Sequence, residues 1–142
     1  MSTKVSVEEA NAYLDDTFEG SENRCRVTLM ENGRCIVRLE ANGSHLRPGG
    51  YISGPTQMSM VDTVVYMAIM TKLGIVPMAV TTSLNMTFLR PCIGDVVEAE
   101  ARLMKLGRTL AVADVDVRIA GAEKPSSHAV VTYAIPQNGG AT

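Results

Sequence analysis

The residue best suited to chemistry in this sequence is Asp62, which lies inside a long run of apolar residues. An ionised carboxylate in apolar surroundings is costly unless it is paired or hydrogen-bonded, so it is either a structural acid or a chemical group. Upstream, Ser53, Gly54 and Pro55 are typical of a helix start. We therefore expect a carboxylate about two turns into a buried helix, with free backbone N–H groups at the helix start.

A helix start and a carboxylate together suffice for acyl-group hydrolysis without a metal or a catalytic triad. The unpaired N–H groups and positive dipole end can hold a developing oxyanion. The carboxylate can take a proton from water or attack directly. The structural alternatives are that Asp62 caps a loop or pairs with an arginine, and that Ser53 is simply the helix N-cap.

Other catalytic patterns do not occur in the sequence. No serine lies in a G-x-S-x-G motif, and neither His45 nor His128 has the local signature of a Ser-His-Asp triad. The sequence has no zinc-ligand spacing, P-loop or dinucleotide fingerprint. We expect neither a metal nor a resident cofactor.

The composition indicates one domain over residues 1–142, without a nucleic-acid surface or a membrane span. The net charge is −2 and no cluster of basic residues is present, so nucleic acid is not an expected partner. The N-terminus does not resemble a signal peptide, and Asp62 interrupts the longest apolar run. The odd number of cysteines predicts reduced thiols in a cytoplasmic protein, although Cys25 and Cys35 could form a bridge if a hairpin places them opposite one another.

Hydrophobic periodicity predicts the first elements. Residues 6–18 are typical of a short helix with a Ser6–Glu9 capping box, ended by a break at 20–23, so that residues 1–23 form a helix and lead-in. A β-hairpin follows, with a type I′ turn at Asn32-Gly33. Its first strand alternates, with Val27 and Leu29 on one face and Met30 on the other.

The rest of the chain predicts an α+β fold. A long loop at 42–53 precedes a central helix at 55–73 that is apolar nearly all round and should be buried on most sides. Strand patterns then occur at 79–90, 97–103, 114–119 and 127–135, before a flexible tail at 136–142. An antiparallel sheet wrapped around one long helix fits this order.

Several of these residues form a pattern that occurs in a known family. The pattern is Ser53-Gly54-Pro55, six residues, then Asp62-Thr63, followed by a hydroxyl-rich strand ending at Arg90-Pro91 and a Gly94-Asp95 turn. Over roughly residues 25–135 the sequence resembles the hot-dog acyl-CoA thioesterases of the phenylacetate-pathway (PaaI-like) type. The resemblance implies the hot-dog fold, in which the antiparallel sheet wraps the central helix.

The resemblance also implies roles for individual residues. Asp62 corresponds to the catalytic carboxylate, as general base or nucleophile, and Gly54 to the glycine whose N–H polarises the thioester carbonyl. Thr81 falls where a hydroxyl often orients water, and Ser83 is the nearby alternative. The family's active sites form between two subunits, which implies a homodimer or a tetramer built from two dimers.

This sequence departs from the family pattern at three positions. Ser53 stands where histidine is usual, Pro55 replaces a second glycine and removes a backbone donor, and Arg47 stands where asparagine often orients water or the carbonyl. Arg47 could act electrostatically, as part of the catalytic group, or pair with Asp62 of the partner subunit. The predicted substrate-binding residues are Ser53, Ser83, Arg90, Lys105 and Arg108, of which the three basic ones could equally be ordinary surface charges.

The predicted function is hydrolysis of acyl-CoA thioesters to free acid and coenzyme A, which is part of the substrate. Two alternatives remain open at this point. One is an acyl-CoA or lipid-binding module without catalysis, which the departures at Arg47 and Ser53 favour. The other is a hot-dog hydratase or dehydratase, which usually relies on a histidine near an acid, and no histidine falls in a matching position.

Overall fold

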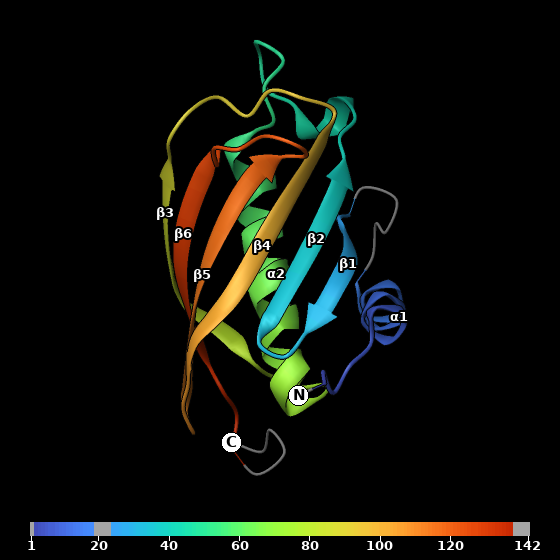
Figure 1. Ribbon diagram of the computed structural model, residues 1–142, viewed down its shortest axis with the longest axis vertical. Coiled ribbons are helices and arrows are strands. Elements are labelled where there is room, and N and C mark those ends of the chain that lie inside the picture. Colours follow the sequence, from blue (N-terminus) through green and yellow to red (C-terminus); the bar gives the residue numbers. More distant parts are fainter. Residues whose placement is uncertain (1, 19–23, 138–142) are drawn as a thin grey trace.

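The computed structural model contains one curved antiparallel sheet that wraps a long helix, α2 (Gly54–Leu73) (Figure 1). It describes residues 2–18 and 24–137. In their order across the sheet, the strands are β1 (Arg26–Glu31), β2 (Arg34–Glu40), β4 (Val96–Leu106), β5 (Leu110–Ile119), β6 (Ser127–Ala134) and β3 (Val80–Phe88). This arrangement confirms the predicted α+β hot-dog fold class.

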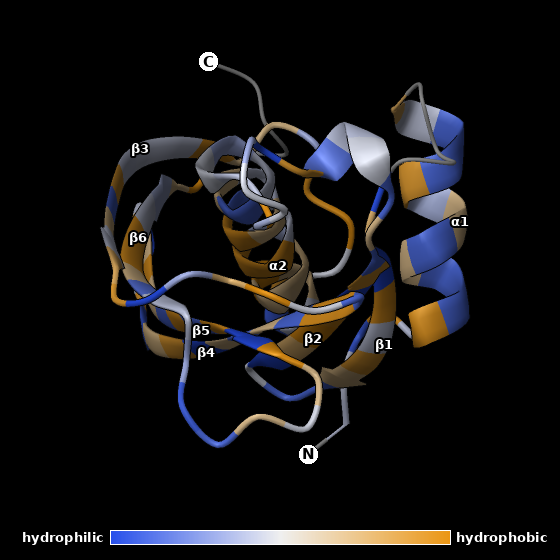
Figure 2. Cartoon of the chain, turned by 90° about the horizontal axis from the view of Figure 1, so that it is seen from above, coloured by the Kyte–Doolittle hydropathy of each residue, from blue (hydrophilic) through white to orange (hydrophobic). Residues whose placement is uncertain are grey.

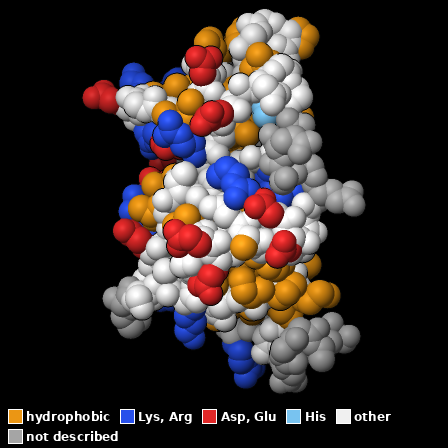
Figure 3. All heavy atoms as spheres, turned by 90° about the vertical axis from the view of Figure 1, so that its right-hand side faces the viewer, with side chains coloured by type: hydrophobic (Ala, Val, Ile, Leu, Met, Phe, Trp, Pro, Cys, Tyr) orange, Lys and Arg blue, Asp and Glu red, His pale blue; other side chains and the backbone are white. Residues whose placement is uncertain are grey.

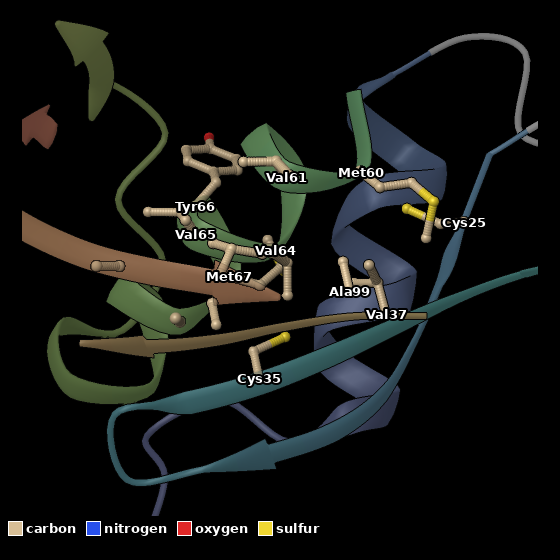
Figure 4. Close-up of a cluster of buried hydrophobic side chains, with 14 of the residues drawn as sticks. Cys25, Cys35, Val37, Met60, Val61, Val64, Val65, Tyr66, Met67 and Ala99 are labelled. Carbon is tan, nitrogen blue, oxygen red and sulfur yellow. The ribbon is translucent and has the colours of Figure 1, made fainter. Parts of the chain in front are cut away.

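The second half of α2 forms the centre of the hydrophobic core. Residues 64–71 are all buried, because the curved sheet surrounds this part of the helix. Figure 4 shows Val64 and Met67 of α2 in the same cluster as Val37 of β2 and Ala99 of β4. The helix ends at Gly74, whose φ of 82° suits glycine and whose N–H donates to the Met70 carbonyl at 3.0 Å.

The N-terminal helix α1 (Val7–Thr17) lies outside the sheet beside β1 (Figure 2). The predicted capping box is confirmed, since Ser6 Oγ accepts from Glu9 N–H and the Glu9 carboxylate accepts from Ser6 N–H. The Asn11 side chain accepts from Val27 N–H at 2.9 Å and donates to Val27 C=O at 3.0 Å. This amide covers part of the free edge of β1. The predicted break at 20–23 lies outside the described residues.

The first hairpin differs from its prediction on one strand. The Asn32-Gly33 turn is confirmed, because Glu31 pairs with Arg34 and Gly33 has a φ of 78°. However, the register of β1 shifts between Val27 and Leu29. A bulge of one residue exchanges the two faces, so Met30 is buried while Leu29 is half-buried.

The hairpin does not place Cys25 and Cys35 opposite one another, so the possible bridge between them is wrong. Cys35 pairs with Met30 near the turn, whereas Cys25 precedes β1 at the other end of the hairpin. Both thiols are free and buried, as is that of Cys92. Burial raises the pKa of Cys25 to about 11 and also raises the pKa of Cys92, so these thiols stay protonated.

The later strands follow the predicted order with different limits. β4 extends the predicted strand at both ends, β5 begins four residues earlier than its alternating pattern, and β6 ends one residue before its predicted limit. A 3-10 turn at Gly43–His45 lies in the predicted loop. Of the predicted tail, residues 138–142 lie outside the described part of the chain.

Strand β3 is the exposed edge of the sheet. Among the described residues it pairs only with β6, and most of its residues are exposed. The Val80 and Phe88 side chains at its two ends are 54% and 49% exposed, large fractions for apolar residues. A long exposed edge strand is an open template for pairing with another chain.

The outer surface carries charges of both signs. Across the outer face of the sheet, Arg34 pairs with Glu100 at 2.5 Å and Arg38 pairs with Glu98 at 3.4 Å. Acidic and basic side chains are also interspersed on the face that carries α1 and β1 (Figure 3). Within the described residues, no helix is long and apolar enough to cross a membrane.

Replacing Met67 with alanine should lower the free energy of unfolding by about 2–5 kcal/mol, because the side chain is fully buried and its removal leaves a cavity. Urea denaturation measures the loss. The matched control is Met104→Ala, at a side chain 64% exposed, which should change the free energy by less than about 0.5 kcal/mol. Similar losses in both variants would contradict the assignment of α2 to the core.

Candidate active site

The start of α2 presents one backbone N–H that has no acceptor within the part of the chain that the structure describes. The Ser53 hydroxyl accepts from Thr56 N–H at 3.2 Å, and the Ser53 carbonyl accepts from Gln57 N–H at 3.1 Å. Pro55 has no N–H. Among the described residues, Gly54 N–H has no acceptor, so it is the one donor of the first turn available to a ligand. The helix dipole adds positive potential at this point.

A cavity of about 310 Å³ opens beside this donor. Gly54 lines it together with Phe88, whose ring would lie 3.4 Å from a Cβ atom placed on Gly54. Arg47 and Arg90 also line the cavity and bring two positive charges close to the helix N-terminus. This end of the helix can therefore receive a polarised carbonyl or an anionic group.

Asp62 is hydrogen-bonded to two hydroxyl groups. Thr81 Oγ1 donates to Asp62 Oδ1 at 2.5 Å, and the Tyr133 hydroxyl lies 2.8 Å from the same oxygen and 3.0 Å from the Asp62 main-chain carbonyl. The prediction of a buried carboxylate is wrong for the single chain, in which Asp62 is half-buried. The sheet covers the second half of α2, whereas Asp62 lies on the first half, where Thr81 of β3 and Tyr133 of β6 reach it and the neighbouring Ser59 stays exposed.

Aromatic side chains surround the carboxylate. Tyr66 stacks on Tyr133 with ring centroids 6.1 Å apart, and its hydroxyl contacts that of Tyr13 at 2.7 Å. Asp62, Tyr66, Tyr133 and Phe18 line two adjoining cavities of about 340 and 290 Å³. Burial raises the pKa of both Tyr66 and Tyr133, so their hydroxyls remain neutral donors at ordinary pH. The surroundings of Asp62 thus combine an apolar wall with fixed hydroxyl donors.

The two main elements of the site lie apart within one chain. Gly54 and Asp62 are separated by eight positions on α2. At 1.5 Å of rise per residue, this corresponds to about 12 Å along the helix axis. A single carbonyl group cannot contact both when each contact requires about 3 Å.

The remaining predicted site residues fall into separate groups. Of the two strand hydroxyls, Thr81 reaches Asp62, whereas Ser83 follows a register shift and pairs with Thr132 instead. Arg47 donates to the Pro48 carbonyl at 3.1 Å and lies over the Tyr51 ring, so in this chain it is not bonded to Asp62.

The basic residues lie at both ends of α2. Arg90 lies near Gly54 and donates to the Pro125 carbonyl. Arg108 lines a separate cavity of about 440 Å³ with Leu73, at the opposite end of the helix, and Lys105 lies in the same hairpin. One chain therefore does not bring Lys105 or Arg108 to Gly54.

The predicted catalytic and substrate-binding residues did not include Tyr133 or Tyr66. A usable signal existed for Tyr133, because it continues the inward alternation of Ala129 and Val131, and a buried tyrosine hydroxyl needs a partner. Tyr66 lies four residues after Asp62, which places the two on the same helix face. Among the described residues, no group of three or more acidic, histidine or cysteine side chains is arranged to hold a metal.

Comparison with models of protein families identifies the family to which this chain belongs. The thioesterase superfamily model matches residues 49–126, which is more than half of the chain and includes Gly54 and Asp62. The chain belongs to the thioesterase superfamily. No curated protein matches it closely enough to count as a relative.

Solved structures of similar proteins share the fold. A candidate thioesterase from Silicibacter sp. TM1040 is 35% identical, with a TM-score of 0.87 over 96% of this chain and 95% of that one. Phenylacetic acid degradation protein PaaI from Thermus thermophilus is 26% identical, with a TM-score of 0.70 over 81% and 96%. Thioesterase superfamily member 2 from zebra fish is 22% identical, with a TM-score of 0.82 over 93% and 99%, and supports the fold alone. The predicted family resemblance is confirmed.

Replacing Ser53 with alanine should lower the free energy of unfolding by about 1 kcal/mol, because Thr56 N–H loses its acceptor at the start of α2. The matched control is Ser59→Ala, on the exposed side of the same helix, which should leave the free energy within about 0.5 kcal/mol. Chemical denaturation of both variants checks the difference. An equal effect at the two positions would contradict the capping role of Ser53.

Proposed function

We propose that this protein hydrolyses acyl-CoA thioesters to free acid and coenzyme A. Its membership of the thioesterase superfamily supports thioester hydrolysis as the general reaction. The observation that carries the proposal is the Gly54 amide, which has no acceptor among the described residues and lies at the positive end of the helix that also bears Asp62. One group can polarise a thioester carbonyl and the other can deliver the nucleophile.

In the proposed reaction, the thioester carbonyl oxygen accepts a hydrogen bond from Gly54 N–H. Asp62 then either takes a proton from a water molecule that attacks the carbonyl carbon, or attacks that carbon itself to form an anhydride that water hydrolyses. The carbon–sulfur bond breaks, and coenzyme A leaves as the thiolate and is protonated. Negative charge on the carbonyl oxygen increases as the new bond forms, so the Gly54 amide stabilises the transition state more than the substrate.

We propose that the complete site forms between two copies of the chain. The separation of about 12 Å along α2 prevents one chain from supplying both groups to one carbonyl. The exposed edge strand β3, with the exposed apolar side chains of Val80 and Phe88 at its two ends, supports a dimer in which two β3 strands pair. Two such dimers can then assemble into a tetramer.

A twofold dimer also gives the distant basic residues a role. Leu110 pairs with Ala134, and Ala134 pairs with Val80, so the Lys105–Arg108 hairpin lies at the Val80 end of β3. Antiparallel pairing of two β3 strands would bring this end close to the Phe88 end of the partner. Lys105 and Arg108 of one subunit would then join Arg47 and Arg90 of the other in binding the phosphates of coenzyme A.

We place the reaction in the cytoplasm, which suits the three free thiols.

Replacing Asp62 with asparagine should lower the rate of thiol release from acyl-CoA by about 10²-fold or more, because the amide cannot accept the proton or form the anhydride. A panel of short, medium and aromatic acyl-CoAs with a thiol reagent measures the rate. The control is Asp95→Asn at an exposed turn residue, with wild-type rates expected. Unchanged hydrolysis by Asp62→Asn would remove the proposed role of Asp62, and tight acyl-CoA binding without turnover by the wild type would favour the binding module.

Mixed dimers test whether the site is shared. Gly54→Pro removes the proposed oxyanion donor and Asp62→Asn removes the carboxylate, so each variant alone should be nearly inactive. Subunits mixed in equal amounts should recover about a quarter of the wild-type rate, because half of the dimers contain one intact site. Circular dichroism checks that both variants are folded. No recovery in confirmed heterodimers would place both groups in the same subunit.

A further inference from the structure

The two hydroxyls that contact Asp62 converge on one of its oxygens. Thr81 Oγ1 lies 2.5 Å and the Tyr133 hydroxyl 2.8 Å from Oδ1. Among the described residues, no donor is hydrogen-bonded to Oδ2. The carboxylate is therefore asymmetric, with one oxygen held by the protein and the other open toward the cavities that Asp62 lines.

The Tyr133 hydroxyl is held in place from several sides. Its side chain is buried, at 3% exposure, on the inward face of β6. Its ring stacks at 24° on Tyr66, whose own hydroxyl contacts Tyr13 and donates to the Pro77 carbonyl at 3.1 Å. Few rotations are open to a ring packed in this way, so the hydroxyl remains at Asp62.

Tyr133 is also suited to donate rather than accept. Burial, and to a smaller extent the charge of Asp62, raise the pKa of Tyr133. The phenol therefore keeps its proton at neutral pH. A neutral donor at a carboxylate makes a charge-assisted hydrogen bond, which is stronger and more directional than one between neutral groups.

We propose that Tyr133 is a positioning residue that, together with Thr81, holds Oδ1 of Asp62 and leaves Oδ2 as the oxygen that reacts. The proposal rests on the thioesterase function proposed above and assigns which carboxylate oxygen serves as base or nucleophile. Tyr133 touches no reacting atom and acts through Asp62. It lies in the last strand, outside the matched family span of residues 49–126.

The test is Tyr133→Phe, which keeps the ring stack and removes only the hydroxyl. Loss of a hydrogen bond to a charged group should lower kcat by about 10- to 100-fold while KM changes by less than about threefold. Tyr66→Phe is the matched comparison, because it removes a hydroxyl from the same stack without breaking a bond to Asp62, and it should lower kcat less. Thermal unfolding of both variants checks that they remain folded.

A second background separates positioning from a structural role. In Asp62→Asn, where the reacting carboxylate is absent, Tyr133→Phe should cause no further loss of the residual rate. An equal loss in both backgrounds, or a change confined to KM, would overturn the proposal. So would an unchanged kcat in Tyr133→Phe alone.

A measurement without substrate keeps this proposal distinct from the proposed function. A hydroxyl proton bonded to a carboxylate exchanges slowly with water and should give a downfield proton resonance that is missing in Tyr133→Phe and shifted in Asp62→Asn. If the wild type released no thiol, the proposed thioester hydrolysis would be wrong, but the resonance would still show whether Tyr133 is hydrogen-bonded to Asp62. A Tyr133 hydroxyl signal that is unaffected by Asp62→Asn would overturn the positioning role even in an active enzyme.

Discussion

The burial of α2 inside the curved sheet is the interaction on which the rest of the structure depends. Residues 64–71 contribute the centre of the core, and removing their apolar surface from water is the main stabilising term of the fold. Because this half of the helix is fixed, its axis also sets the positions of Gly54 and Asp62. The site is therefore built on a rigid element, which suits groups that must be placed within fractions of an ångström.

The same helix is only partly covered, and the incomplete cover creates the site. Where the sheet ends at β3, the side of α2 that carries Ser59 and Asp62 remains open, so the carboxylate keeps access to solvent and substrate. Thr81 and Tyr133 provide the hydrogen bonds that a partly desolvated carboxylate requires. The departures from the family pattern lie at the other end of this open region, where Ser53 serves as the cap and Pro55 leaves Gly54 as the only free donor of the first turn among the described residues.

Much of the fold and part of the site could be predicted from local patterns. Ser6, Ser53 and Asn32-Gly33 act through neighbours a few residues away, so their caps and turn are present in the sequence itself. The face of Met30 could not be predicted, because a bulge depends on how β1 pairs with its partners. The partial exposure of Asp62 was missed for a similar reason, since a helix sequence does not reveal where its surrounding sheet ends.

The sequence by itself determined the order of the elements, the position of the helix start and the carboxylate two turns later, because these follow from residue type and spacing along one chain. Only the tertiary structure decided which side chains meet at Asp62. Tyr133 lies 71 residues from Asp62 in the sequence, and the pairing of β6 with β3 beside α2 brings the two together. A hydrogen bond requires its two atoms to lie about 3 Å apart. Whether residues distant in the sequence come that close depends on strand pairing and helix packing, which sequence spacing does not show.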